Sequence, residues 1–364
     1  MNRRDLLLGA AAAATTAASA QSTGEPLRIA ISGLVHGHVG GFLNGAVKRQ
    51  DCKIVGLADP SQDLRTRYAE RYKIQQTYAS TTELIDKTKP EVVASFGSTF
   101  DHAAVVEACA AKKVPVMMEK PLAVGNDHAK RIAKAAATSG IPVIVNYETT
   151  WYASHGEIWK LLHDQKAAGD IRRMVIMDGH QGPKEIGVQP EFLEWLTDPV
   201  KNGAGALFDF GCYGANLMTW MMDNARPTSI LCLAKCIKPE IYPKVDDDAT
   251  ILVEYPKAQG VIEASWNWPF SRKDFEVYGQ TGYAIATGGN NLRVRLNQKS
   301  AEETRTPEPL PQQDRDSISY LISVVRDKRK VTGLSSLENN LIVTEILSAA
   351  RESAKLGRRV NLSA

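Results

Sequence analysis

Five short apolar segments recur along the first part of the chain, separated by longer stretches of helical character. They are LRIAIS (27–32), CKIVGLAD (52–59), EVVASFG (91–97), VPVMMEK (114–120) and IPVIVNY (141–147). Apolar strands that alternate with amphipathic helices are typical of βαβ units, whose strands form a parallel sheet. This alternation predicts that residues 27–147 form a doubly wound domain with helices on both faces of the sheet.

The pattern changes after residue 147. Strand-like segments now follow one another through turns, which is typical of an antiparallel sheet. They are RRMVIMDG, SILCLAKC, ATILVEYP, GVIEASWNW and DFEVYGQTGYAIATG. Helices are expected at 153–168, 211–223, 312–328 and 336–356. The expected fold class is therefore α/β: a doubly wound parallel sheet, then an α/β domain at 148–364 with a large, mainly antiparallel open sheet.

The first twenty residues have the composition of an export signal. Arg3 and Arg4 precede an apolar run that starts at Leu6, and a small-residue cleavage site ends at Ala20. Paired arginines in such a leader are typical of the twin-arginine route. We expect residues 1–20 to be a twin-arginine signal peptide and the mature protein to be periplasmic or secreted. A chance N-terminal helix is the alternative.

Composition argues against several other classes. The formal net charge is only +3 and no basic stripe is interleaved with aromatic residues, so no nucleic-acid partner is expected. The leader is too short and too rich in Ala and Thr to span a bilayer, so no membrane association is expected after its removal. Cys232 and Cys236, expected on one strand, would be too far apart to pair. The sequence has no C-x-x-C or H-E-x-x-H motif, and no metal is expected.

The segment ISGLVHGHVGGF follows the first apolar segment, where a dinucleotide-binding fold has its glycine-rich loop. Gly33 fits the first position of G-x-G-x-x-G, whereas Val35 and His38 replace the other two glycines. Gly37 offers a second bare backbone position, and His36 and His38 are candidate donors to the phosphates. The loop by itself is weak evidence for a bound dinucleotide.

Asp59 ends the second apolar segment. In a dinucleotide-binding fold, an acidic side chain here binds the ribose hydroxyls of NAD and repels the 2′-phosphate of NADP, so NAD is favoured over NADP. Asp59 would equally suit the N-cap of the helix that follows. The residue alone leaves both interpretations open.

The segment VMMEKPLAV brings an acid, a lysine and a proline to the end of a buried strand, the edge where α/β sheets bind ligands. Desolvation and a nearby nicotinamide would lower the pKa of Lys120 and make it a candidate proton donor or acceptor. Pro121 would hold the backbone of Lys120 extended. A solvated lysine at a strand end is the alternative, and the tripeptide alone does not decide between them.

The segment NGAGALFDFGCYGANLMTW contains a second candidate group. Asp209 and Tyr213 are four residues apart and would share one face of a helix. A carboxylate beside a tyrosine hydroxyl can orient a substrate and relay a proton. The alternative is a capping aspartate and a half-buried tyrosine.

Taken together, these segments resemble the Gfo/Idh/MocA superfamily of oxidoreductases over nearly the whole mature chain. The most specific matches are Glu119-Lys120-Pro121, the segment STFDH that ends in His102, and the glycine-rich run at 203–213. AAGDIRRM, GVIEASWNW with FEVYGQTGYA, and the terminal ESAKLGRRVNL add weaker support.

The resemblance implies a Rossmann domain that binds NAD(P), followed by a substrate-binding and dimerisation domain. It implies that Lys120 is the catalytic lysine, with Asp209 and Tyr213 as its partners. The residues that it places against the nicotinamide are His102, Glu119 and Asn146, beside Lys120. Many members have His at position 213, but glucose–fructose oxidoreductase resembles this chain in having Tyr there. We interpret Tyr213 as a changed proton relay.

The leader and the resemblance together lead to a hypothesis about turnover. The twin-arginine route exports folded, cofactor-loaded proteins, so NAD is expected to stay bound and to be recycled in each turnover. Sugar–sugar oxidoreduction and NAD-assisted glycoside cleavage both fit, and a homo-oligomer (dimer or tetramer) is expected. The rival hypotheses are a catalytically inactive exported carbohydrate-binding protein and a conventional cytoplasmic dehydrogenase.

Aromatic and basic residues of the second half are candidates for contact with a sugar, since sugars stack on aromatic rings. The principal candidates are Trp151, His180, Trp268 and Arg272, with Tyr152 and Trp266 as further ones. Aromatic residues in strands more often belong to the core, which is the alternative for each. His180 is the best single candidate.

Overall fold

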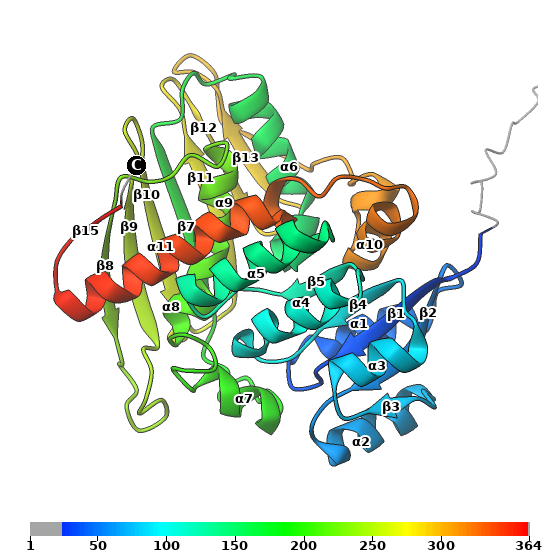
Figure 1. Cartoon of the computed structure of the whole chain (residues 1–364). Coiled ribbons are helices and arrows are strands. Elements are labelled where there is room, and N and C mark those ends of the chain that lie inside the picture. Colours follow the sequence, from blue (N-terminus) through cyan, green and yellow to red (C-terminus); the bar gives the residue numbers. More distant parts are fainter. Residues whose placement is uncertain (1–23, 363–364) are drawn as a thin grey trace, which may run out of the picture.

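The computed structural model describes residues 24–362 and contains two sheets with helices packed on them (Figure 1). The expected signal peptide, residues 1–20, lies outside the described residues, as do residues 21–23 and 363–364. None of the described helices is long and apolar enough to cross a membrane.

The first sheet has six parallel strands in the order β3-β2-β1-β4-β5-β6, which confirms the expected doubly wound fold. The strands are β1 (Leu27–Ser32), β2 (Cys52–Ala58), β3 (Thr77–Tyr78), β4 (Val92–Ser95), β5 (Val116–Glu119) and β6 (Val143–Asn146). β4 and β5 are buried along their whole length, as central strands covered on both faces are. The strand order reverses between β1 and β4, and ligands bind outside the carboxyl ends of strands at such a point.

The helices of this half follow the apolar segments as expected. They are α1 (Val39–Ala46), α2 (Gln62–Tyr72), α3 (Thr81–Thr88), the 3₁₀ turn η1 (Thr99–Asp101), α4 (His102–Ala111) and α5 (Asn126–Ser139). α2 and α3 begin at serine caps, because the side chains of Ser61 and Ser80 accept hydrogen bonds from backbone N–H groups of the first turn.

The second sheet has nine strands in the order β14-β13-β12-β11-β7-β10-β9-β8-β15. They are β7 (Arg173–Gly179), β8 (Ser229–Lys235), β9 (Asp248–Glu254), β10 (Gln259–Ser265), β11 (Arg272–Tyr278), β12 (Tyr283–Thr287), β13 (Leu292–Arg295), β14 (Glu303–Arg305) and β15 (Val360–Asn361). β7 and β10 pair in parallel and the remaining described pairs are antiparallel, which confirms the expected mainly antiparallel sheet. Cys236 follows the end of β8, so the expectation that it shares a strand with Cys232 is wrong; all five cysteines are free.

Helices cover one face of the nine-stranded sheet. α9 (Gly211–Met221) packs on β7 and β10, and α11 (Leu337–Leu356) crosses β8 (Figure 1). The other elements are η2 (Glu148–Trp151), α6 (Ala153–Ile158), the π-helical turn η3 (Trp159–Asp164), α7 (Pro190–Leu196), α8 (Ala206–Asp209), η4 (Gln312–Asp314), α10 (Ser317–Arg326) and η5 (Gly333–Ser335). The single helix expected at 153–168 is thus α6 followed by a π turn.

α10 returns to the first domain. Its buried residues Ile318, Leu321 and Val324 belong to the same hydrophobic core as β1 and α1. The two halves are therefore joined by a helix from the C-terminal part of the chain as well as by the connection after β6.

Candidate active site

A cavity of about 990 Å³ opens at the carboxyl ends of β1 and β2. From the first domain it is lined by, among others, Ser32, Gly33, Val35, Asp59 and Gly97. α7 of the second domain supplies the opposite wall with Pro190, Glu191, Glu194 and Trp195. The volume lies at the upper end of the range for small-molecule and cofactor sites, which runs to roughly 1,000 Å³.

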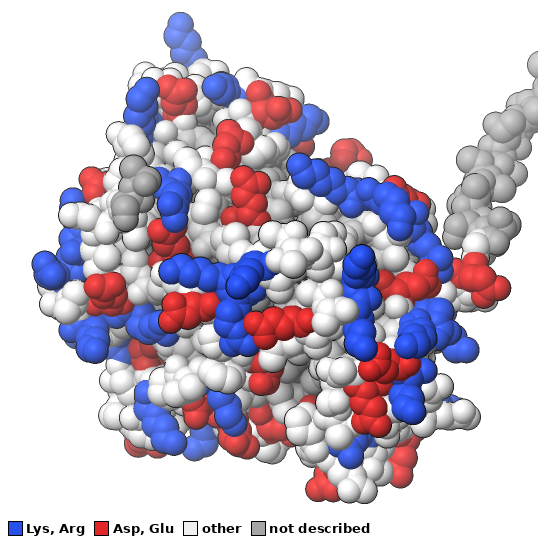
Figure 2. Space-filling view, in the orientation of Figure 1, with Lys and Arg blue, Asp and Glu red and all other residues white. Residues whose placement is uncertain are grey.

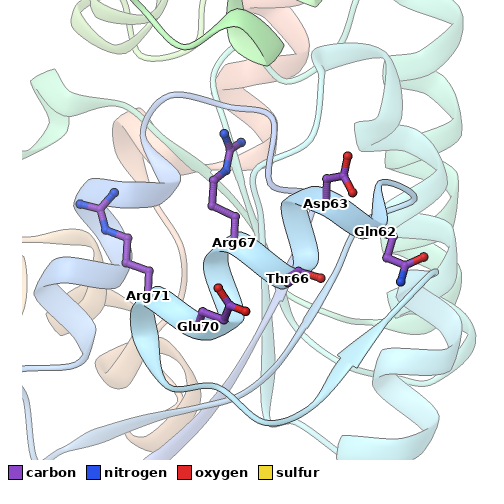
Figure 3. A pocket seen from close by; sticks show the side chains of 6 residues that line it. All are labelled: Gln62, Asp63, Thr66, Arg67, Glu70 and Arg71. Carbon is purple, nitrogen blue, oxygen red and sulfur yellow. The ribbon is translucent and has the colours of Figure 1, made fainter.

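A smaller hollow of about 620 Å³ lies along α2 and shares Asp63 and Arg67 with the cavity. Arg67 and Arg71 extend from the same side of α2, one turn apart (Figure 3). Arg67 forms an ion pair with Glu191 of α7, so this hollow borders the place where α7 meets the first domain.

On the face of the molecule seen in Figure 2, basic and acidic side chains are interspersed.

Asp59 holds two loops of the cavity together. One carboxylate oxygen accepts a hydrogen bond from Leu34 N and the other from Ser61 N, both at 2.8 Å. Because Ser61 is the N-cap of α2, the interpretation of Asp59 as the helix cap is wrong. A carboxylate has about four acceptor positions, so both oxygens keep capacity for ribose hydroxyls. The cavity, with this carboxylate in its wall, fits NAD.

The loop after β1 packs against the loop after β4 and against α7. Gly33 has φ +82°, and a Cβ atom there would lie 2.3 Å from Gly97 N, so glycine is required by packing against the loop after β4. A Cβ atom at Gly37 would lie 3.0 Å from the ring of Phe192 on α7. His36 is buried, and its ring packs against those of Phe192 and Trp195. Contact of His36 and Gly37 with phosphates thus stays a prediction.

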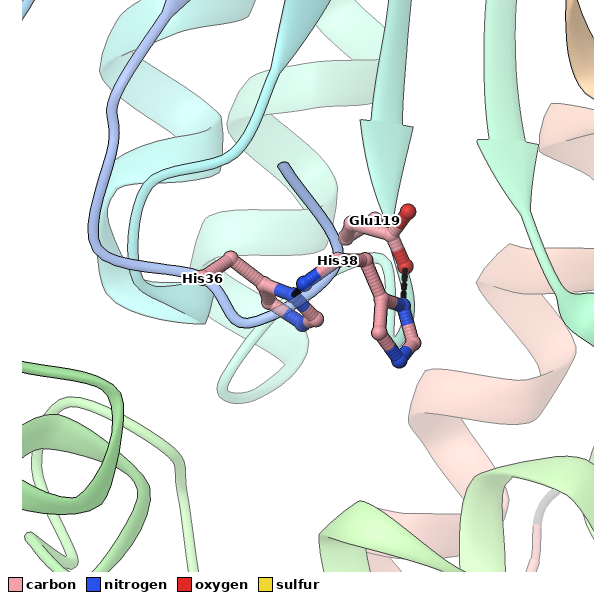
Figure 4. Close-up of side chains that lie close together, drawn as sticks. All are labelled: His36, His38 and Glu119. Carbon is pink, nitrogen blue, oxygen red and sulfur yellow. Dashed lines mark hydrogen bonds and ion pairs between the residues drawn. The ribbon is translucent and has the colours of Figure 1, made fainter. Parts of the chain in front are cut away.

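His38 bridges this loop to the end of β5 (Figure 4). Its Nδ1 lies 2.9 Å from Glu119 Oε2, and its backbone N–H donates to His36 Nδ1 at 3.1 Å. Glu119 also accepts a hydrogen bond from Asn146 Nδ2 at 2.7 Å. Burial opposes ionisation of Glu119, but the nearby histidines and the amide outweigh it and lower the pKa of its carboxyl to about 2.

The His36, His38 and Glu119 side chains are close enough to raise the question of a metal. Their candidate ligand atoms lie within 4.8 Å of one another. Ligand atoms around a tetrahedral zinc lie only roughly 3.4 Å apart. Since the His38 and Glu119 atoms are already paired with each other, we describe the group as a hydrogen-bonded link between loop and strand.

Lys120 and Asp209 form a buried pair, although 89 residues separate them in the sequence. Lys120 Nζ donates to the carboxylate Oδ1 of Asp209 at 2.5 Å and to its backbone carbonyl at 2.8 Å. Trp266 Nε1 donates to the other carboxylate oxygen at 3.0 Å. An ammonium group has three donors, so one remains for a substrate oxygen.

The pair carries a full charge on each partner. Burial lowers the pKa of Lys120, as expected, but the Asp209 carboxylate raises it by more, and the net direction is upward. The protein groups alone thus shift the Lys120 pKa in the opposite direction to the one expected beside a nicotinamide, and the lowered pKa of the NAD-loaded site stays a prediction. Burial raises the pKa of Asp209, yet Lys120 outweighs that effect and the net direction is downward. Lys120 is thus an ammonium group fixed by a carboxylate.

Tyr213 lies beside this pair but on a different helix from Asp209. α8 ends at Asp209 and α9 begins at Gly211, so the expectation that the two share one helical face is wrong. The Tyr213 ring centre is 4.9 Å from Lys120 Nζ and 4.2 Å from Lys273 Nζ. Burial raises the pKa of its hydroxyl well above the usual value. The ring is an aromatic platform for two ammonium groups, and the proton relay stays a prediction.

His102 and Trp151 support the segment around Lys120. Nδ1 of His102 is 3.1 Å from the carbonyl oxygen of Pro121, and its Nε2 is buried with no partner among the described residues. Trp151 Nε1 donates to Asn146 Oδ1 at 3.2 Å, which places this ring beside Asn146 and Glu119. Trp151 thus lies with the residues expected at the nicotinamide.

The other sugar-binding candidates are divided by the sheet. His180 continues β7, and its ring stands edge-on to Phe210 at 4.9 Å, next to Asp209. Arg272 and Asp274 form an ion pair on one face of β11, and Lys273 lies on the other face. The Arg272 guanidinium also lies over the ring of Trp268. The structure therefore brings His180 to the Lys120 pair and turns the Arg272 side chain away from it.

Trp266 is fully buried and its Nε1 orients Asp209, and its stacking on a substrate stays a prediction. The hydroxyl of Tyr152 donates a hydrogen bond to Glu148 at 2.5 Å.

The structure adds residues that the sequence reasoning missed. Asp178 and Lys273 face each other on β7 and β11, on the face that the helices cover. Both sit in a row of alternating apolar residues: Met174 and Ile176 precede Asp178, and Phe275 and Val277 follow Lys273. A charged residue within such an apolar row could have indicated a functional position from the sequence, because every second residue of a strand points to the same face.

The parallel sheet, its dinucleotide-sized cavity and the buried lysine–carboxylate pair at its edge define an NAD-binding oxidoreductase. Family comparison agrees with this class. Residues 27–147 match the family described as "Oxidoreductase family, NAD-binding Rossmann fold", and residues 159–285 match the GFO/IDH/MocA C-terminal domain. The chain belongs to the Gfo/Idh/MocA family of oxidoreductases.

Similar proteins include several enzymes. A trans-1,2-dihydrobenzene-1,2-diol dehydrogenase from Xenopus laevis is 26% identical over 83% of this chain and 90% of its own length. The match to the Xenopus tropicalis enzyme of the same name is also 26% identical, but spans only 59% of this chain and 61% of that protein. A 1,5-anhydro-D-fructose reductase from Ensifer adhaerens is 24% identical over 69% of this chain and 72% of its own length.

Solved structures share the fold. An aldose–aldose oxidoreductase from Caulobacter crescentus, complexed with glycerol, has a TM-score of 0.78 at 20% identity, covering 93% of this chain and 100% of that one. An inositol dehydrogenase homologue from Azotobacter vinelandii, complexed with NAD+, has a TM-score of 0.79 at 16% identity, covering 93% and 98%.

Proposed function

We propose that this protein oxidises a hydroxyl-bearing carbon of a sugar or related polyol, or reduces the corresponding carbonyl, with tightly bound NAD that is recycled in each turnover. The observation that carries the proposal is the buried Lys120 ammonium, which has one proton left for a substrate oxygen. The named relatives, which include a diol dehydrogenase and an anhydrofructose reductase, support a polyhydroxylated substrate.

NAD, when bound, takes up or returns the hydride of the substrate carbon. Asp59 would hold its ribose hydroxyls, and Glu119, Asn146 and His102 would lie near its nicotinamide. Lys120 would bind the reacting oxygen, stabilise negative charge that develops there, and supply the proton when a carbonyl is reduced. Asp209 and Trp266 would keep the ammonium group in place.

The packing of α7 supports retention of the cofactor. Trp195 Nε1 donates to the carbonyl oxygen of Val35 at 3.3 Å, and Phe192 and Trp195 enclose His36. Because α7 also forms a wall of the cavity, a dinucleotide there would leave only after these contacts separate. A retained cofactor suits sugar–sugar oxidoreduction or NAD-assisted glycoside cleavage, in which each turnover regenerates the starting form.

The first test is to purify the protein without added cofactor, denature it, and identify released dinucleotide by mass and absorbance. We expect near-stoichiometric NAD(H), and we expect aldoses or polyols from a panel to reduce the bound NAD. A protein that carries none, and takes up neither NAD nor NADP, would contradict the proposal and favour an inactive carbohydrate-binding protein.

We also propose export by the twin-arginine route to the periplasm. The support is the Arg3-Arg4 pair ahead of the apolar run. Replacing both arginines by lysine is expected to leave the protein in the cytoplasm, as measured by fractionation and immunoblotting. Unchanged periplasmic amounts would contradict this route.

A further inference from the structure

Asp178 lies on β7 directly opposite Lys273 on β11 in the register of the sheet. Its carboxyl is among the most deeply buried charged groups of the molecule, with 1% of the residue exposed. Yet Oδ1 of Asp178 is buried without any hydrogen-bond donor among the described residues. Because buried polar groups normally have a hydrogen-bond partner, the retention of this unsatisfied carboxyl needs a reason.

The surrounding charges do not supply that reason. Lys273, the cation opposite Asp178 in register, donates a hydrogen bond to Glu148 at 2.6 Å. Glu148 also accepts a hydrogen bond from the hydroxyl of Tyr152. The other charged groups acting on Asp178 are Asp274 and Lys120. Burial raises the pKa of the Asp178 carboxyl to about 8, so at neutral pH it is largely protonated and can both donate and accept a hydrogen bond.

Asp178 belongs to the same site as the reacting centre. Lys273, its partner in register, contacts the Tyr213 ring, which Lys120 contacts as well. His180 follows the end of β7, and its ring packs edge-on against Phe210, the residue after Asp209. Lys120 and Lys273 thus lie against one aromatic platform, each with an acidic residue close by, and whereas Asp209 is hydrogen-bonded to Lys120, Asp178 Oδ1 has no partner among the described residues.

We propose that Asp178 is a substrate-binding residue that holds a second hydroxyl, next to the one bound by Lys120, and so selects vicinal polyols over isolated alcohols. The inference rests on the proposed function and names its substrate class. A purely structural buried carboxyl would have an internal partner, as Asp247 has in the backbone N–H groups of Ile237 and Lys238.

The test compares Asp178→Ala and the isosteric Asp178→Asn with the wild type and with Glu263→Gln. Glu263→Gln makes the same acid-to-amide change as Asp178→Asn on neighbouring β10, but Glu263 lies on the open face, paired with Thr250. The probes are D-glucose and D-galactose, each beside its 2-deoxy analogue, which lacks the hydroxyl adjacent to both C1 and C3. Steady-state turnover with a second sugar as hydride acceptor gives kcat and KM, and calorimetric titration of the NAD-loaded protein gives binding.

For the wild type we expect the 2-deoxy sugar to bind about 10- to 100-fold more weakly than the parent. Asp178→Ala is expected to raise KM for the parent sugar by a similar factor, with kcat and bound NAD nearly unchanged, and to bind parent and deoxy sugars alike. Asp178→Asn, which keeps a donor and an acceptor, is expected to fall between wild type and Asp178→Ala and guards against loss of folding.

The inference is overturned if Asp178→Ala matches Glu263→Gln in KM, or if it still discriminates against the deoxy sugar. Turnover that is indifferent to Asp178 would leave the proposed function standing and remove the inference. If sugar binding depends on Asp178 but no sugar reduces bound NAD, the inference holds and the proposed function fails. If no sugar binds the wild type, both fail.

Discussion

At the scale of single residues, the role of Lys120 depends on which groups accept hydrogen bonds from its three ammonium protons. Two of them are taken by Asp209, and the indole of Trp266 holds that carboxylate from the other side. The upward shift of the Lys120 pKa follows from this arrangement. The residue is therefore suited to binding and protonating a substrate oxygen, more than to acting as a free base.

Lys120→Met removes the ammonium group but keeps most of the side-chain volume. We expect reduction of bound NAD by substrate to slow by about 10²- to 10³-fold, the usual contribution of a donor that stabilises developing negative charge on a substrate oxygen. The amount of NAD that co-purifies should not change. The control is Lys160→Met, on an exposed turn. Near-normal single-turnover rates in Lys120→Met would contradict the assignment.

Asp178 makes a prediction about stability. Its folded-state pKa of about 8 lies above the ordinary 3.8, so between these values the folded protein binds more protons than the unfolded chain. The free energy of unfolding therefore falls as pH rises through this window. Asp178→Asn lacks the titration, and its stability relative to wild type should rise by a few kcal/mol from pH 4 to pH 9. Denaturant unfolding across this range measures the difference; a constant difference would contradict the prediction.

At the scale of elements, we expect the contact between α7 and the loop after β1 to govern how the cofactor is held. α7 comes from the second half of the chain, yet it encloses His36 and forms a wall of the dinucleotide cavity. The loop has lost the glycines of a usual phosphate loop, and its side chains pack against this helix instead. We expect this contact to compensate for the atypical loop by holding the wall of the cofactor site in place.

Trp195→Ala removes the hydrogen bond to Val35 and the ring beside His36. We expect NAD to dissociate about tenfold faster, since one neutral hydrogen bond and some buried contact are lost. Release can be followed by dilution of the loaded protein into an NAD-scavenging enzyme. Phe270→Ala, an exposed aromatic outside the cavity, is the control. Equal release rates would argue against this role of α7.

At the scale of the whole molecule, the nine-stranded sheet has one covered and one open face. On the open face Leu233 and Leu252 are 69% and 45% exposed, with the half-buried Leu231 and Val261 near them. Apolar side chains grouped on an exposed sheet face are typical of an interaction surface. We accordingly propose that copies of this chain associate through it.

Leu252→Arg is expected to shift the protein towards monomers, because the arginine charge would lose its hydration in the interface. Light scattering coupled to size-exclusion chromatography measures the mass. Leu356→Arg, at the end of α11, introduces the same charge at a similarly exposed leucine and should leave the mass unchanged. An identical oligomer in both variants would contradict this interface.

The sequence by itself determined the features that depend on neighbouring residues. The alternation of apolar and helical segments predicted both sheets, because side-chain periodicity follows from local backbone geometry. Motifs such as Glu119-Lys120-Pro121 pointed to a reactive lysine at a strand end. These signals lie within a few residues of one another.

Only the tertiary structure decided the rest. It joined Lys120 to Asp209 and Trp266, turned Arg272 to the open face, placed α7 on the nucleotide loop, and brought Asp178 to the site. The pKa of Lys120 could not be judged from sequence, since burial and a distant carboxylate act in opposite directions and only packing sets their balance. Distances between residues far apart in the chain are set by how the elements pack, and no local pattern records them.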